Sequence, residues 1–480
     1  MRYIDIRNIS EDSSIFGLIG LFGLAIATGL IVALGGKLGA MFVAFLLLGV
    51  FFAVIVKARP FISLCVFVLV IVNPLLIGER LSIPLPGLND DLELREILLL
   101  IILGFAVVKS FQRRWSFKQV SLLIPAILFS GLVIFSIPIS IMRGIQASAV
   151  LSEAFPWSLY VFLPLAFAVL ITNEKELKIV LIVYLMSALF GSILAFSQGF
   201  VGPDRILIGA RQLKVFHGSV RVYTESEAQN LISFAVFTAL LLKANKPIHR
   251  VLYLVACLVI AMGMFVAISR TMIVAQVLVL VMIFWWVGRR RFLQSAFVLV
   301  SVIILLILVV SSVQLSETAS IFDTFSGWFV IIFTPGGQES MSVVGRVTQY
   351  RIAIQQIAHH PLWGVGLGKS VFSEVDLGIQ KAVASDLHNG FLEIALKLGI
   401  TGLLLFLAWI VAGLKDIYYF GQISGDQWKA VSKGLFIGIG MIWVVSSVVT
   451  WVVSAPTLAQ IGSAIGIAEA YIVLKTTHRL

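Results

Sequence analysis

Apolar runs long enough to cross a bilayer recur through almost the whole chain, and they restrict its fold more than any other feature. A transmembrane helix needs about 20 apolar residues. By that measure the sequence contains about 14 spans, which begin near residues 15, 38, 61, 96, 120, 159, 179, 231, 251, 271, 295, 391, 434 and 459. Hydrophobic residues make up 60% of the 480 residues and charged residues 12%, which excludes an ordinary soluble domain. The sequence therefore predicts an all-α polytopic membrane protein.

Basic residues fix the expected orientation, because loops rich in lysine and arginine stay on the cytoplasmic side. They cluster in alternate loops, at Lys57 and Arg59, Lys109 to Lys118, Lys175 and Lys178, Lys243 to Arg250, Arg289 to Arg291, and Lys415 to Lys433. These loops and both termini are predicted to be cytoplasmic. Much of the net charge of +11 then reflects topology and contact with anionic lipids, so no nucleic-acid partner is needed.

The N-terminal segment and the two cysteines add little chemistry. Residues 1–14 are polar, and the apolar run behind them has no small-residue cleavage pattern of a signal peptide, so the first helix is expected to stay in the mature protein. Cys65 and Cys257 lie inside apolar runs, where they are expected to be packing residues. No disulfide and no zinc site is expected.

Three parts follow from the spacing of the spans. Residues 1–312 hold the first 11 or so spans, residues 313–390 form one large outer loop, and residues 391–480 hold about three more. Outer loops of this length are usually functional or disordered. This one is rich in apolar and aromatic residues, so it is expected to be partly helical and to fold against the membrane domain. Four of the six histidines are on this outer side: His217, His359, His360 and His388.

The outer loops also carry arginines that the topology rule does not require. Arg205, Arg211 and Arg221 follow the seventh span, where they can form a funnel for an anionic substrate. Arg270 belongs to "SRT", the tight turn between two spans within residues 251–287, which places it at the outer membrane surface. It is either an arginine that reaches to the interface from a helix end or a ligand for an anion at head-group depth.

A helix is predicted between Gly345 and Pro361. One side of it carries a mostly polar stripe at intervals of three and four, made of Arg346, Gln349, Ala353, Gln356 and His360. Such a stripe is either solvated and structural or part of a site. The following "GVGLGKS", residues 364–370, looks like a phosphate loop, but Trp363 stands where that motif needs its first glycine and no clear strand precedes it.

The strings "HPLWGVGLG" and "HNGFLEIALKLGITGLLLF", at the end of the large loop, resemble the C-terminal signature of the O-antigen ligase and O-antigen polymerase superfamily. Gly345-Arg346 resembles the pair that opens the loop helix in that family, and Ser269-Arg270 the pair that opens one of its spans. The specific resemblance covers about residues 260 to 410. It implies transfer of a glycan from an undecaprenyl diphosphate carrier to a hydroxyl of an acceptor glycan on the periplasmic side of the bacterial inner membrane, without metal, nucleotide or other cofactor.

The resemblance also implies roles for residues. Arg270 and Arg346 would bind the diphosphate, because guanidinium groups form paired hydrogen bonds with phosphates. His388 would act as the base or orienter of the acceptor hydroxyl, since imidazoles titrate near neutral pH, unless it only caps the helix that follows. Asp386 is placed to polarise His388. Further candidates for substrate binding are Arg205, Arg211, Arg221, Arg351, His360 and Asn389.

Acidic residues in the first outer loop form a weaker candidate site, at Asp90, Asp91 and Glu93. Polyprenyl-dependent glycosyltransferases often use such residues, but an outer loop is expected to be acidic for topological reasons alone.

The expected function is therefore a metal-independent membrane glycosyltransferase of the ligase type, with a lipid A-core or other glycan as acceptor. A polymerase that joins repeat units of a surface polysaccharide uses the same chemistry and stays open. A transporter of small anions is a third possibility. It would be expected to show inverted repeats and charged residues near the middle of the bilayer, and neither is evident in the sequence.

Overall fold

The computed structural model describes residues 59–72, 82–84, 91–112, 121–201, 212–216, 219–223, 226–266, 270–287, 314–316, 319–320, 339–369, 387–448 and 453–477. The chain divides into two units, Met1–Ser63 and Leu64–Leu480, and nearly all of the described residues belong to the second. The spans expected near residues 15, 38 and 295 lie outside the described ranges.

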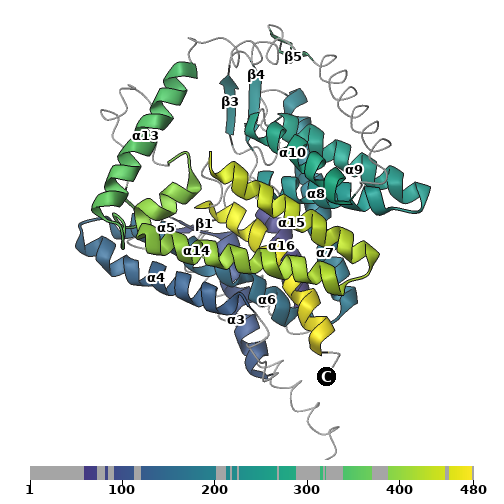
Figure 1. Ribbon diagram of the computed structural model, residues 1–480, viewed down its shortest axis with the longest axis horizontal. Coiled ribbons are helices and arrows are strands. Elements are labelled where there is room, and N and C mark those ends of the chain that lie inside the picture. The colour runs from purple at the N-terminus through teal and green to yellow at the C-terminus, as the bar shows by residue number, and fades with distance from the viewer. Residues whose placement is uncertain are drawn as a thin grey trace, which may run out of the picture. The chain divides into compact units, whose positions relative to one another are not determined.

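Helices dominate the described part of the chain (Figure 1). In chain order they are α2 (Phe61–Val72), α3 (Leu94–Gln112), α4 (Leu123–Met142), α5 (Ala147–Leu159), the short 3₁₀ helix η4 (Tyr160–Phe162), α6 (Leu163–Leu170), α7 (Glu174–Val201), α8 (Glu227–Lys243), α9 (Pro247–Val266), α10 (Arg270–Val287), α13 (Glu339–His359), α14 (Gly390–Ile423), α15 (Asp426–Ser446) and α16 (Ala455–Thr477).

Three small antiparallel hairpins accompany the helices, which the all-α expectation did not include. They pair β1 (Ser82–Pro84) with β2 (Asp91–Glu93), β3 (Gln212–Phe216) with β4 (Ser219–Tyr223), and β5 (Gln314–Ser316) with β6 (Ala319–Ser320). All three lie in segments that the sequence assigns to outer loops. Two-stranded hairpins of this size depend on neighbouring structure for their stability, so the fold remains a helical one.

Seven helical segments among the described residues are long and apolar enough to span a membrane. They are Leu123–Met142, Ala147–Leu170, Glu174–Ser197, Pro247–Phe265, Gly390–Ile423, Asp426–Ser446 and Ala455–Thr476, and two shorter apolar helices cover Phe61–Val70 and Thr271–Trp286. The chain is thus a multi-pass membrane protein. The expectation of about 14 spans extends into undescribed residues and stays a prediction.

One span differs from the expectation in a way that the prolines explain. The sequence pattern placed it near residue 159, but its helical segment begins at Ala147 and runs to Leu170. Pro156 lies inside α5, and Pro164 lies in the first turn of α6, with η4 between them. Because proline lacks the N–H that an α-helix needs, the chain changes to a 3₁₀ turn there and then resumes its helix.

Helix α16 forms the centre of the described bundle, since 94% of its most apolar stretch is buried. It packs on α6, α14, α8 and α7. Polar side chains join these helices inside the bundle: the backbone N–H of Gln229 donates to Oε1 of Gln460 at 3.0 Å, and Nε2 of Gln229 donates to Oγ of Ser187 at 2.6 Å. Such interhelical hydrogen bonds stabilise helix contacts where no water is available.

Helix α14 is broken near its start, and residues 361–366 form hydrogen bonds across this break. Its 34 residues include Gly399 with φ of 73° and ψ of −179°, which is not helical. At about 1.5 Å per residue the whole helix would measure roughly 50 Å, which exceeds the bilayer core of about 30 Å. Residues 400–423 alone would span roughly 36 Å. The break therefore separates a membrane-crossing part from the first turns, residues 390–398.

Candidate active site

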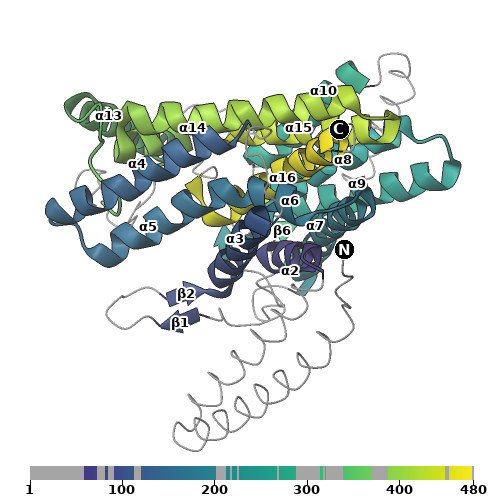
Figure 2. The ribbon, with the colours of Figure 1, turned by 90° about the horizontal axis from the view of Figure 1, so that it is seen from below.

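The helix expected between Gly345 and Pro361 is present as α13, which begins at Glu339 and ends at His359. Figures 1 and 2 both place it beside the N-terminal end of α14, with which it is in contact. A small core of Ala353, Val365, Leu387 and Leu396 fixes this contact, with Tyr350 and Leu392 packed against it. The helix in the large loop is thus attached to the segment that carries the histidine motif.

The polar stripe of α13 is not uniformly solvated. Gln349 is 4% exposed and Ala353 is fully buried, whereas Arg346 and His360 are exposed. The interpretation of the stripe as a solvated face therefore holds for its two ends only. Its middle faces α14, and this brings a buried amide next to His388.

His388 is held by two contacts from α13. Its Nδ1 lies 3.1 Å from Oε1 of Gln349, and the hydroxyl of Tyr350 donates to the backbone carbonyl of His388 at 2.8 Å. Partial burial raises the pKa of Tyr350, and the positive charge of Arg346 opposes that shift. The phenol therefore stays protonated and able to donate near neutral pH. Residues three and four apart are neighbours on a helix, so Arg346 lies one turn from this pair.

The cap of α14 is Asn389 rather than His388. Oδ1 of Asn389 accepts from the backbone N–H groups of Phe391 and Leu392, both at 3.0 Å, and its Nδ2 donates to the carbonyl of Ser447 at 2.8 Å. Asparagine is among the best N-cap residues because its side chain reaches the free amides of the first turn. The interpretation of His388 as a helix cap is therefore wrong, and its imidazole is exposed at the surface.

The "HPLWGVGLG" segment docks across the break in α14. The amides of Val365 and Gly366 donate to the carbonyls of Leu396 and Lys397 at 2.8 and 3.2 Å. In the other direction Ile400 donates its N–H to the carbonyl of Pro361 at 2.7 Å. These bonds satisfy backbone groups that the non-helical Gly399 releases. A Cβ on Gly399 would overlap the carbonyl of Leu362, so the close approach requires glycine there.

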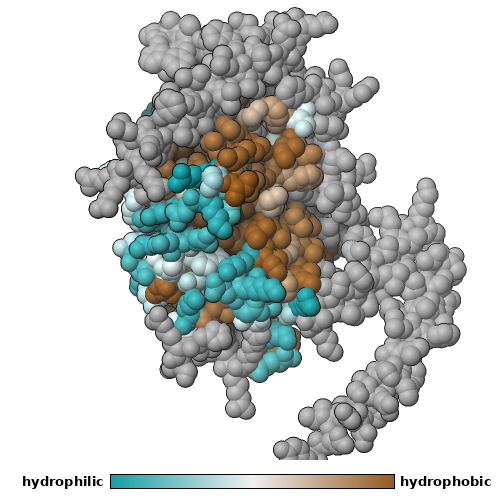
Figure 3. All heavy atoms as spheres, turned by 90° about the vertical axis from the view of Figure 1, so that its right-hand side faces the viewer, coloured by the Kyte–Doolittle hydropathy of each residue, from teal (hydrophilic) through white to brown (hydrophobic). Residues whose placement is uncertain are grey.

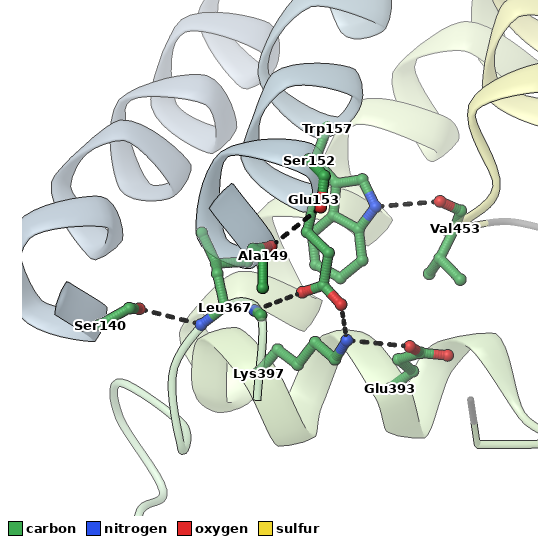
Figure 4. A network of polar contacts seen from close by, with 10 residues as sticks. Ser140, Ala149, Ser152, Glu153, Trp157, Leu367, Glu393, Lys397 and Val453 are labelled. Carbon is green, nitrogen blue, oxygen red and sulfur yellow. Dashed lines mark hydrogen bonds and ion pairs between the residues drawn. The ribbon is translucent and has the colours of Figure 1, made fainter. Parts of the chain in front are cut away.

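A buried cluster of charges lies under the same segment (Figure 4). Glu153 of α5 points toward Lys397 of α14, and Nζ of Lys397 also lies 3.2 Å from Oε1 of Glu393. The other oxygen of Glu153 accepts from the amide of Gly368 at 2.8 Å. Lys397 is only 4% exposed, so its charge depends on these partners. One carboxylate thus ties α5, the docked segment and α14 together.

These contacts exclude a phosphate loop at "GVGLGKS". The amide of Leu367 donates to Oγ of Ser140 at 2.9 Å. The neighbouring amides of Val365, Gly366 and Gly368 donate to Leu396, Lys397 and Glu153, respectively. A phosphate loop needs free, converging amides. Four consecutive amides here are used within the protein, and one of them faces a carboxylate.

The other candidates fall into two groups. In the first group the structure describes the backbone but not the side chain: Arg270 begins α10, Arg221 lies in β4 opposite Lys214, and Asp91 and Glu93 lie in β2. The second group lies outside the described ranges and consists of Asp90, Arg205, Arg211 and Asp386. The turn expected at "SRT" is only partly placed: α9 ends at Val266 and α10 begins at Arg270, so Arg270 and Thr271 lie in the first turn of a helix, and residues 267–269 lie outside the described ranges.

Arg351 and His360 are described, and both are exposed. Arg351 lies two residues from Gln349 and thus on another face of α13. His360 lies 11 residues beyond Gln349, roughly 16 Å along the helix axis. The structure therefore brings Arg346, Gln349, Tyr350 and His388 together and leaves Arg351 and His360 apart from them. Among the described residues no group of three or more histidine, cysteine or acidic residues is arranged to hold a metal ion.

Residues 255–407 match the family model described as O-antigen ligase. This segment is therefore similar to O-antigen ligases. The match includes "SRT", α13, the docked segment and the first turns of α14. No curated protein sequence matches the chain significantly.

Two groups of residues were not predicted from the sequence. Gln349 was assigned to the stripe but not to His388, because their contact joins residues 39 positions apart. Glu153 and Lys397 were missed because each lies in a segment of mixed or apolar character, and nothing in the sequence pairs them. A lysine in "EIALKLG", otherwise an apolar helix, was the available signal, since a charge there needs a partner.

Proposed function

We propose that this protein transfers a glycan from an undecaprenyl diphosphate carrier to a hydroxyl of an acceptor glycan, on the periplasmic side of the inner membrane. The similarity of residues 255–407 to O-antigen ligases supports membrane glycosyl transfer of this type. The observation that carries the proposal is the position of His388, whose exposed imidazole is oriented by Gln349 one helical turn from Arg346.

The chemistry assigns one role to each group. The acceptor oxygen attacks the anomeric carbon of the donor sugar, and the bond from that carbon to the diphosphate oxygen breaks. His388 takes the proton of the hydroxyl, and the bonding electrons leave with the diphosphate. Arg346 and Arg270 stabilise the charge that accumulates there, because paired hydrogen bonds from guanidinium groups fit phosphate oxygens.

The tautomer of His388 suits a base. A carbonyl oxygen can only accept a hydrogen bond, so Oε1 of Gln349 favours a proton on Nδ1 of His388. The lone pair then remains on Nε2, which is the atom that would receive the proton of the acceptor. Asp386 and the arginines of the preceding outer loop, Arg205, Arg211 and Arg221, are proposed as further contacts to substrate.

Purified protein supplied with the lipid-diphosphate donor and a defined acceptor tests the proposal. Transfer should continue in excess EDTA, since arginines rather than a metal ion are proposed to bind the diphosphate. Complete loss of transfer that Mg²⁺ or Mn²⁺ restores would move the site toward Asp90 and Asp91.

The acceptor decides between a ligase and a polymerase, which share this chemistry. We propose a ligase, and glycan analysis of a deletion strain distinguishes the two. Loss of the polymer from its lipid anchor indicates a ligase, whereas capping of that anchor with single repeat units indicates a polymerase. A transporter would be expected to carry charged residues inside its spans, and Glu469 of α16 and Asp416 of α14 are buried there. Both are acidic and would repel an anion, so they do not favour transport of small anions.

A further inference from the structure

Three lysines gather at the end of the bundle opposite to His388. Lys243 is the last residue of α8, and Lys429 and Lys433 lie in the first turns of α15, which follows the far end of α14. Lys429 and Lys433 are four residues apart, so they share a helix face. Lys429 and Lys243 both act on Lys433 as like charges. The packing of α8 against α15 thus places three ammonium groups near one another.

Acidic residues do not compensate this charge. The described ion pairs on this side of the bundle join Lys178 and Lys475 to Glu174, at 3.4 and 3.5 Å, and do not include the three lysines. Asp426, three residues before Lys429, supplies one negative charge against three positive ones. Like charges held together are unfavourable unless an anion binds between them.

Aromatic residues locate the cluster at a membrane boundary. Nζ of Lys433 donates to the carbonyl of Trp286 at 3.1 Å and lies 5.1 Å from the centre of its ring. The Trp286 ring meets Phe436 edge-on at 5.4 Å, and Trp285 beside it is 77% exposed. Exposed tryptophans concentrate at the level of lipid head groups. The lysines are therefore held at that level by α8, α10 and α15.

The surface has the polarity expected of such a boundary. On the face drawn in Figure 3, toward which α9 extends in Figure 1, a hydrophilic area lies directly beside a hydrophobic one. The exposed apolar residues of α9 and α10 include Val251, Leu252, Val274 and Val281. The positive-inside rule predicts this end of the bundle to be cytoplasmic.

We propose that Lys243, Lys429 and Lys433 form a binding site for the phosphate of an anionic phospholipid in the inner leaflet. The three ammonium groups supply the charge, Lys433 is oriented by Trp286, and the apolar surface beside them accommodates the acyl chains. A soluble anion would use the lysines only. The site does not depend on the proposed glycan transfer, because it lies at the other end of the bundle.

Native mass spectrometry of the purified full-length chain tests the proposal by counting retained lipids during titration. The wild type should bind phosphatidylglycerol more tightly than phosphatidylcholine with the same acyl chains. Each basic residue near the membrane surface contributes about 1 kcal/mol, so the double variant Lys429→Gln with Lys433→Gln should bind phosphatidylglycerol about 30-fold more weakly. Lys429→Arg with Lys433→Arg should retain the preference.

The double variant Lys175→Gln with Lys178→Gln is the matched control. It removes the same charge from the same end of the bundle but leaves the three lysines unchanged, so its affinity for phosphatidylglycerol should stay within about twofold of wild type. An equal loss in this control would show a diffuse effect of surface charge and overturn the site. Competition by millimolar inorganic phosphate would show a site for soluble anions, and the absence of any preference for phosphatidylglycerol would also contradict the proposal.

Discussion

Gln349 and His388 are 39 positions apart in the chain, yet Oε1 of the glutamine lies 3.1 Å from Nδ1 of the histidine. The contact joins α13, the one helix that the structure describes in the large loop, to the residue before the cap of α14. It gives the imidazole a fixed orientation, which an exposed side chain otherwise lacks. An amide that is 4% exposed has few alternative partners, so this pairing is expected to persist in solution.

Replacing the glutamine tests whether that orientation matters. Gln349→Leu keeps the volume of the buried side chain but removes the acceptor of the hydrogen bond, which contributes about 1 kcal/mol. We expect turnover of glycan transfer to fall about three- to tenfold while the affinity for the lipid-diphosphate donor stays unchanged. Gln355→Leu, an exposed glutamine on another face of α13, is the control and should transfer at the wild-type rate. Equal rates for the two variants would remove Gln349 from the site.

Arg346 is expected to bind the diphosphate through paired hydrogen bonds. Arg346→Lys keeps the charge but loses the planar fork, so it should weaken transition-state stabilisation by about 1–3 kcal/mol, measured as kcat/KM. Arg351→Lys makes the same change five residues away, on another face of the helix. If the lysine variant of Arg351 loses as much as that of Arg346, the diphosphate is bound by a different surface of α13.

Gly399 is predicted to be irreplaceable for a structural reason. Its φ is positive, and a Cβ there would overlap the carbonyl of Leu362 in the docked segment. Gly399→Ala should destabilise the protein by more than about 2 kcal/mol, because both the backbone conformation and the contact become unfavourable. Gly440→Ala, in a helix position with nothing near the added methyl group, should be neutral or slightly stabilising. Equilibrium unfolding in mixed detergent micelles measures both.

The cluster of Glu153, Glu393 and Lys397 under the docked segment is expected to depend on its ion pairs for stability. Glu153→Ala leaves Lys397 buried with one partner fewer, which should lower the free energy of unfolding by about 3 kcal/mol. The triple variant Glu153→Ala, Glu393→Gln and Lys397→Met should recover a large part of that loss, since all three charges of the cluster are then gone. Glu174→Ala, which removes a solvent-exposed partner of Lys178 and Lys475, should cost about 1 kcal/mol or less. A triple variant less stable than Glu153→Ala alone would contradict this account of the cluster.

Hydrophobic length and periodicity predicted the membrane class, the helix between Gly345 and Pro361 and the start of a new apolar helix close to Arg270, because these depend on local sequence. The Gly399 break and the docking of residues 361–368 across it were not predictable. They arise from backbone contacts between segments that are distant in the chain, and the glycines resembled a phosphate loop although Trp363 departs from that motif. Asn389 shows the same limit: a histidine and an asparagine before a helix both look like caps, and only the geometry assigns the role.

The topology of the site can be tested with exposed positions of the structure. A cysteine at Ala358 of α13 should react with a membrane-impermeant thiol reagent in intact spheroplasts, and a cysteine at Lys246, between α8 and α9, should not. The loop charges give this direction. Reversed labelling would place the histidine motif in the cytoplasm, away from a periplasmic acceptor.

The central claim is that His388 acts on the acceptor and not on the donor. Titrating the purified His388→Ala variant with the lipid-diphosphate donor, and measuring glycan transfer on the same sample, tests it most directly. We predict donor affinity close to that of wild type and turnover lower by roughly 10²–10⁴-fold, the usual contribution of a general base. Transfer by His388→Ala at the wild-type rate would contradict the assignment.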